Sequence, residues 1–105
     1  MVKWYTTETI AGEEISESLG VAMGNTIRAR NIGRDIMAGL GTIVGGEVPE
    51  YTEMMAHSRD QAIQRMEQKA NEMAADAIVT VRFSTAMIMQ GTAEVMAFGT
   101  AVKLK

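Results

Sequence analysis

The stretch from residue 49 to about residue 74 constrains the fold most, because it is long, periodic and has a clear start. Pro49 suits the first position of a helix, and the carboxylates of Glu50 and Glu53 complement the positive end of the helix dipole. Apolar residues then recur at helical spacing: Met55, Ala62, Ile63, Met66, Ala70, Met73 and Ala74. The pattern predicts one long amphipathic helix with a single buried face.

Segments rich in β-forming residues lie on both sides of this helix. Strands are predicted at 3–7, 15–31, 77–88 and 93–104. Gly24 and Asn25 predict a bend or bulge in the long second segment, and Gln90 and Gly91 predict the turn between the last two strands. In the long segment, larger apolar residues alternate with small and polar ones and share one face: Leu19, Val21, Met23, Ile27 and Ala29. A short helix, weakened by glycines, is predicted at 32–43.

This order of elements predicts an α+β fold with two layers, an antiparallel sheet and one long helix packed on one face of it. At 105 residues the chain forms a single domain, 1–105. The second face of the sheet is expected to carry several large apolar residues: Ile78, Ala86, Ile88, Met96, Phe98, Val102 and Leu104. Because one helix covers only one face, we expect the chain to associate with copies of itself.

Composition excludes several classes of function. A net charge of -3, without any run of lysine or arginine, argues against nucleic acid as an obligatory partner. The absence of cysteine excludes disulfides, thiolate nucleophiles, zinc ribbons and iron–sulfur clusters. No apolar segment is long enough for a membrane span or a signal peptide, so a soluble, cytoplasmic protein is expected.

The segment 28–51 is explained least by core packing, because it holds five of the ten glycines and the only proline. Its candidate ligand-binding residues are Asn31, Arg34, Asp35, Gly45, Gly46, Glu47 and Tyr51. The spacing of Gly39, Gly41 and Gly45 resembles a dinucleotide-binding loop, but the third glycine comes one residue late and no strand precedes the loop. Turn formation before the long helix is the favoured interpretation of these glycines.

Two charged features allow more than one interpretation. Arg28 and Arg30 share a strand face near Arg34, so they could bind a carboxylate or phosphate, or form ion pairs that hold the loop or a subunit contact. The ion-pair interpretation is favoured. His57 is the only histidine and lies near Met54, which suggests a soft metal, but two ligands make a poor site. A surface histidine is favoured, and no metal ligand is assigned.

Five segments, in the same order along the chain, resemble the YbjQ family of uncharacterised bacterial and archaeal proteins. They are Arg-Asn-Ile-Gly-Arg-Asp-Ile at 30–36, Val-Gly-Gly-Glu-Val-Pro-Glu-Tyr at 44–51, 59–66 with its Ala62 and Met66, Ala-Ala-Asp-Ala-Ile at 74–78, and Phe-Gly-Thr-Ala-Val at 98–102. Ala75 departs from the family, which usually has glycine before the Ala/Asp pair. The resemblance implies a dodecin-like α+β subunit, a ring of five subunits and a family label of heavy-metal binding. The lack of cysteine and the single histidine argue against that label.

Two functions follow from these features. The favoured one is a homo-oligomeric binding module that holds a metal ion or small ligand near the glycine-rich segment, at a subunit boundary. The alternative is a small-molecule enzyme, of hydrolase or isomerase type, that uses Asp35 or Glu47 as general base and Arg34 as oxyanion partner. No acid–base pair is positioned by the sequence, so no catalytic residue is assigned and the cofactor stays unknown.

Overall fold

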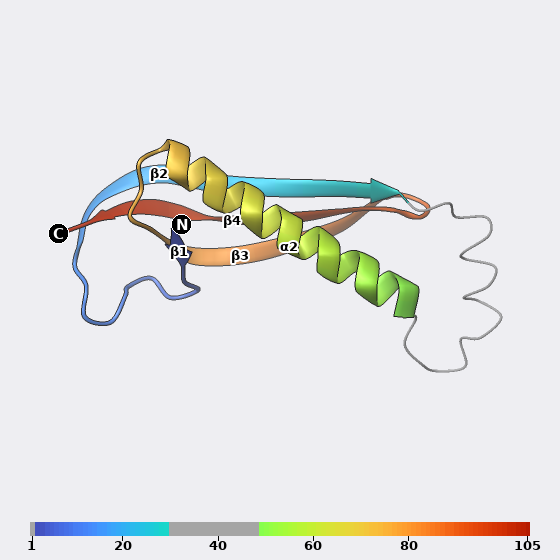
Figure 1. Ribbon diagram of the computed structural model, residues 1–105, viewed down its shortest axis with the longest axis horizontal. Coiled ribbons are helices and arrows are strands. Elements are labelled where there is room, and N and C mark those ends of the chain that lie inside the picture. The colour runs from blue at the N-terminus through green and yellow to red at the C-terminus, as the bar shows by residue number, and fades with distance from the viewer. Residues whose placement is uncertain (1, 30–48) are drawn as a thin grey trace.

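The computed structural model describes residues 2–29 and 49–105, which form one sheet and one long helix (Figure 1). In chain order the elements are β1 (Lys3–Trp4), β2 (Ile15–Ala29), α2 (Pro49–Glu72), β3 (Ala77–Met89) and β4 (Thr92–Leu104). The α+β class with one long helix on the sheet is confirmed. The short helix predicted at 32–43 lies outside the described residues.

The sheet has the strand order β1-β3-β4-β2, with β4 antiparallel to both of its neighbours. The two-residue turn at Gln90 and Gly91 joins β3 to β4 as predicted, and Gly91 has a φ of 74°. The sheet is nevertheless mixed rather than purely antiparallel, because β1 runs parallel to β3 and pairs Trp4 with Ile78. A parallel pair needs a long crossover connection, which β2 and α2 together provide.

The bulge in β2 lies earlier than predicted. The register with β4 is continuous from Gly20 to Ala29, so the bend predicted at Gly24 and Asn25 is wrong. A register shift instead lies between Ser18 and Gly20, where Gly20 has a φ of 116°. The extra residue at the shift is Leu19, which packs against the core under the helix.

Gly24 allows the strand and the helix to approach closely and does not form a bend. A Cβ at this position would overlap the backbone nitrogen of Met66 and the backbone oxygen of Ala62. Strand β2 and helix α2 therefore touch through their backbones, which only glycine permits.

From Gly20 onward, side chains alternate along β2 as predicted, but the smaller ones face the helix. The bulge places Leu19 against the helix-side core and not on the face of Val21 and Met23. Ala22, Gly24 and Thr26 are buried, whereas Val21 and Ile27 are each 56% exposed. Because α2 lies so close to the strand, only small side chains fit between them. The helix-side core is built around these buried apolar residues: Val2, Ala22, Ala62, Met66, Ala70, Ile78, Val81, Val95, Ala97 and Ala101.

Helix α2 ends two residues before the predicted Ala74, at Glu72. Its predicted apolar face is confirmed, since Ala62, Met66 and Ala70 are fully buried. Ala74 is exposed and has a φ of 60°, in the left-handed region. The helix therefore ends in a conformation that glycine usually adopts.

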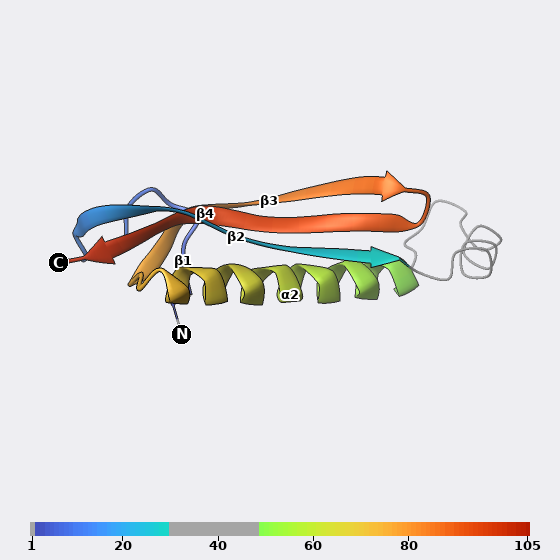
Figure 2. The same cartoon turned by 90° about the horizontal axis from the view of Figure 1, so that it is seen from above.

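The face of the sheet opposite α2 is covered at one end only. Ile10, from the connection between β1 and β2, packs with Ala77, Val79 and Val102 in a second, smaller core. Figure 2 shows this connection on the side of the sheet opposite the helix, at the end near the C-terminus. Of the residues predicted on this face, Val102 is thus buried by the chain itself, and Ile78 belongs to the helix-side core instead.

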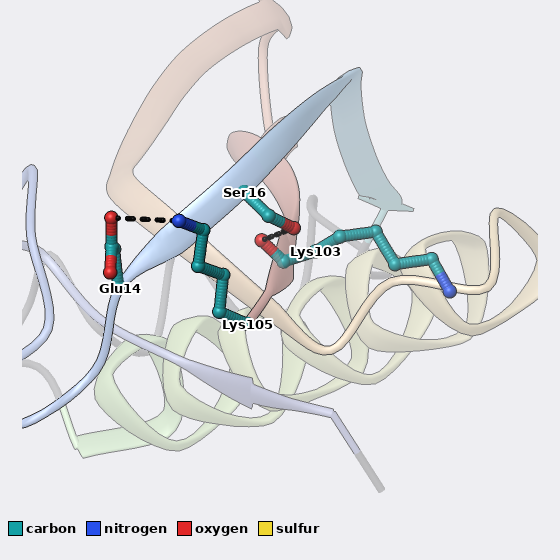
Figure 3. Close-up of polar contacts among 4 residues, drawn as sticks. All are labelled: Glu14, Ser16, Lys103 and Lys105. Carbon is teal, nitrogen blue, oxygen red and sulfur yellow. Dashed lines mark hydrogen bonds and ion pairs between the residues drawn. The ribbon is translucent and has the colours of Figure 1, made fainter.

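Polar contacts fasten the start of β2 to the end of β4 (Figure 3). Lys105 Nζ lies 3.3 Å from Glu14 Oε1, and Ser16 Oγ donates a hydrogen bond of 3.3 Å to the carbonyl oxygen of Lys103. Because the charged side chains are more than half exposed, the ion pair contributes at most about 1 kcal/mol.

Candidate functional site

A pocket of about 400 Å³ lies between the C-terminal end of β2 and residues 54–65 of α2. Its walls are formed by Thr26, Ile27, Arg28, Ala29, Met54, Gln61 and Arg65. This volume falls within the range of small-molecule sites, which combine apolar walls with a few fixed polar groups.

The fold brings these residues together from segments that are distant in the sequence. Alternation along β2 places Thr26 and Arg28 on the same face as Gly24, the face that α2 covers. On the helix, Gln61 and Arg65 are one turn apart and immediately precede the buried residues Ala62 and Met66. The backbone contact at Gly24 therefore fixes how far the strand and helix walls of the pocket stand apart.

Hydrogen bonds hold both guanidinium groups of the pocket in place. Arg28 Nη2 donates to Gln61 Oε1 at 2.7 Å, which links the strand to the helix. Arg65 Nη1 donates to the backbone oxygen of Asn25, also at 2.7 Å, and links them a second time. Each arginine carries five N–H donors, so each keeps donors that these contacts do not use.

Two polar atoms of the pocket residues are buried without a partner within 2–29 and 52–105. They are Thr26 Oγ1 and Arg28 Nε. A buried donor without a hydrogen bond costs about 1–3 kcal/mol, so this part of the structure is not optimised for stability alone.

The charge of the pocket is opposite to that of the whole chain. The described residues of its walls include Arg28 and Arg65 but no aspartate or glutamate. Neither guanidinium forms an ion pair with a carboxylate in the described parts of the chain. The described partner of Arg28 is the neutral amide of Gln61, and the ion-pair interpretation of the arginine cluster stays a prediction because Arg30, Arg34 and Asp35 lie outside the described residues.

Most of the candidate ligand-binding residues lie outside the described residues: Asn31, Arg34, Asp35, Gly45, Gly46 and Glu47. Tyr51 lies in the first turn of α2, but its side chain is also outside the described part. These assignments stay predictions, as do the roles of Asp35 and Glu47 as bases.

The described residues offer little to a metal ion. His57 is exposed on α2, as predicted. Within 2–29 and 49–105 there is no group of three or more histidine, cysteine, aspartate or glutamate residues that could hold one. Over the same ranges, no helix is both long and apolar enough to span a membrane.

Sequence reasoning missed the helix wall of this pocket. The available signal was the spacing of Gln61 and Arg65, which border the apolar stripe one turn apart. Nothing in the sequence showed that this border faces Thr26 and Arg28, because the contact joins residues more than 30 positions apart. The sequence does present Arg28 as a candidate anion ligand, but in a group with Arg30 and Arg34.

Comparison with known proteins gives consistent matches over nearly the whole chain. The YbjQ family model, described as "Putative heavy-metal-binding", matches residues 2–105. A UPF0145 protein from Psychromonas ingrahamii is 62% identical over 100 residues, or 95% of each chain. A UPF0145 protein from Methanosarcina acetivorans is 54% identical over 99 residues, which cover 94% of this chain and 93% of that one.

A solved structure supports the fold. A chain of unknown function from Pediococcus pentosaceus, assigned to the DUF74 family, aligns with a TM-score of 0.70. The alignment covers 99% of this chain and 98% of that chain at 17% sequence identity. At this identity the likeness concerns the fold alone.

Proposed function

The chain belongs to the YbjQ family, and we propose its function from its geometry: a subunit of a homo-oligomeric module that binds a small ligand. The observation that carries the proposal is the uncovered apolar surface of the sheet.

The first uncovered area lies on the face opposite α2. Val21, Met23 and Ile27 of β2 are each more than half exposed. Met23 pairs with the partly exposed Phe98 of β4, so apolar side chains from two strands adjoin on this face. A contiguous apolar area of this kind is typical of an interaction surface.

The second uncovered area lies at the far end of β3. Met87 is 75% exposed and Met89 is 64% exposed, with Ile88 between them. Helix α2 packs mainly on β2 and β4, and its 24 residues span only about 36 Å, against about 50 Å for the 15 residues of β2. The helix is therefore too short to shield the whole sheet.

The edge of β3 adds a backbone argument for self-association. Beyond Val81, whose nitrogen bonds to the oxygen of Tyr5, β3 has a strand neighbour on one side only within the described chain. An open edge with apolar side chains favours pairing with another chain, and a second copy is always available. The count of five subunits comes from the family resemblance. The uncovered surface supports an assembly of more than one subunit and does not give the number.

A small ligand is favoured over a heavy metal as the bound species. The pocket beside Arg28 and Arg65 repels cations, and the chain supplies no thiolate and a single imidazole. The enzyme alternative has no supporting observation among the described residues, because Asp35 and Glu47 lie outside them.

Sedimentation tests the assembly. Analytical ultracentrifugation of the untagged protein at micromolar concentration should give a species several times heavier than the 11.4 kDa chain. Met23→Glu and Phe98→Asp should dissociate it, because each places a charge in the apolar area. Gln68→Glu, on the exposed face of α2, is the matched control and should leave the mass unchanged.

A clean monomer of the unmodified protein would overturn the proposal. A dimer or hexamer would support self-association and reject the family-derived count of five.

A further inference from the structure

We propose that the pocket between β2 and α2 binds the phosphate group of a small phosphate monoester. This inference rests on the proposed binding module and names the class of its ligand. It uses only described residues: Thr26, Arg28, Gln61 and Arg65 as polar groups, with Met54 as an apolar wall.

Charge is the first argument. Two guanidinium groups line one pocket, and no carboxylate is among the described residues that line it. Two like charges held near each other in a partly shielded site repel, so the site gains most from a ligand with about two negative charges. A phosphate monoester carries such a charge near neutral pH.

The positioning of the arginines is the second argument. Mobile surface arginines gain little from a ligand because they must first be ordered. Here the bonds from Arg28 to Gln61 and from Arg65 to the backbone of Asn25 already fix both groups. Positioning before binding lowers the entropic cost of binding an anion.

The unpartnered donors are the third argument. Thr26 is only 3% exposed, and its hydroxyl lacks a hydrogen-bond partner, as does Arg28 Nε, within the described ranges. The bond between Arg28 and Gln61 uses the amide oxygen of Gln61, which leaves its NH₂ group as a further donor. A phosphate presents three terminal oxygens in different directions, whereas a carboxylate presents two in one plane, so donors on both walls suit phosphate better.

An apolar side chain and the size of the pocket supply the fourth argument. Met54 is the apolar side chain on the helix wall, and Ile27 and Ala29, which alternate with Thr26 and Arg28, also border the pocket. The volume of about 400 Å³ exceeds what one inorganic anion needs. Space beside the two arginines is therefore left for the organic part of a monoester.

Titration calorimetry in phosphate-free buffer tests the inference, first with inorganic phosphate and then with phenyl phosphate. We expect saturable binding of both, tighter for phenyl phosphate, and weaker binding as sodium chloride is raised. Arg65→Gln and Arg28→Gln should each weaken binding about tenfold or more, as for the loss of a charge-assisted hydrogen bond. Arg59→Gln, an exposed arginine of the same helix outside the pocket, is the control and should bind as the unmodified protein does.

Thr26→Val separates ligand binding from a structural role. Valine has the shape of threonine without the buried unpartnered hydroxyl, so the variant should melt at a higher temperature and yet bind phosphate more weakly. Arg65 is exposed, so its variant should fold even if the Arg28 variant does not; far-UV circular dichroism checks this.

Three results would overturn the inference: no saturable phosphate binding, equal loss in Arg59→Gln, or binding of succinate in preference to phosphate. The test of phosphate binding is independent of the test of assembly. A monomer that still binds phosphate through Arg65 would reject self-association alone, whereas an oligomer that binds no phosphate would reject the pocket alone.

Discussion

The end of helix α2 allows a quantitative test, because an alanine occupies a position that favours glycine. Ala74 has a φ of 60°. The nitrogen of Ala75 donates to the oxygen of Ala70, and the nitrogen of Ala74 donates to the oxygen of Asn71. This pair of hydrogen bonds defines the Schellman motif, in which the left-handed residue is usually glycine.

We predict that Ala74→Gly stabilises the protein. An L-residue in the left-handed region carries about 1–2 kcal/mol of strain. Glycine removes that strain but adds about 0.4–1 kcal/mol of conformational freedom to the unfolded chain. No buried contact is lost because Ala74 is exposed. The free energy of unfolding should rise by about 0.5–1 kcal/mol, and the melting temperature by about 2–6 °C.

Thermal and urea melts at equal protein concentration measure the change, since assembly makes stability depend on concentration. Ala75→Gly is the matched control: the same methyl is removed one residue later, where the side chain packs against the helix-side core. That variant should lose about 1 kcal/mol. If Ala74→Gly lowers stability as Ala75→Gly does, the left-handed conformation is not a source of strain and the reasoning is refuted.

Two further predictions follow from the strand–helix contact and the ligand inventory. Gly24→Ala should destabilise the protein by about 1–3 kcal/mol or more in urea melts, because the added Cβ meets the helix backbone. Asn25→Ala, at the exposed neighbouring position, is the control, and equal urea midpoints for the two variants would contradict the close approach. Zinc and cadmium should show no submicromolar binding by calorimetry, because the chain has no cysteine and one histidine; tight binding abolished by His57→Ala would instead indicate a site shared between subunits.

The sequence predicted the helix and strands more accurately than the way they pair and pack. Helix α2 was predictable because its proline start and apolar stripe are local signals, and the turn at Gly91 was predictable for the same reason. The parallel pairing of β1 with β3 was not, since it depends on where a crossover of more than 70 residues returns. The pocket was missed on similar grounds, because its two walls meet only after Gly24 has brought strand and helix together.

Residue size was a poor guide to which face of β2 the helix covers. Large apolar residues usually face the interior of their own chain, but here Val21 and Met23 face away from the helix and Ala22 faces it. Backbone contact at Gly24 requires small neighbours, so the spacing between layers decides the face, and a single sequence does not reveal that spacing.

The bulge at Leu19 makes the length of β2 as important as its composition. Side chains on either side of a bulge alternate in opposite phase, so one added residue decides which set meets the helix. Removing Leu19 would leave Ser18 opposite Val102 and Gly20 opposite Ala101. The strand would lose its bulge and the Leu19 side chain under the helix, while Ala22 would still face the helix. From Gly20 to Ala29, where the register is continuous, adding or removing one residue would instead turn the side chains on one side of the change to the opposite face, so such changes should be far less tolerated there than at Leu19.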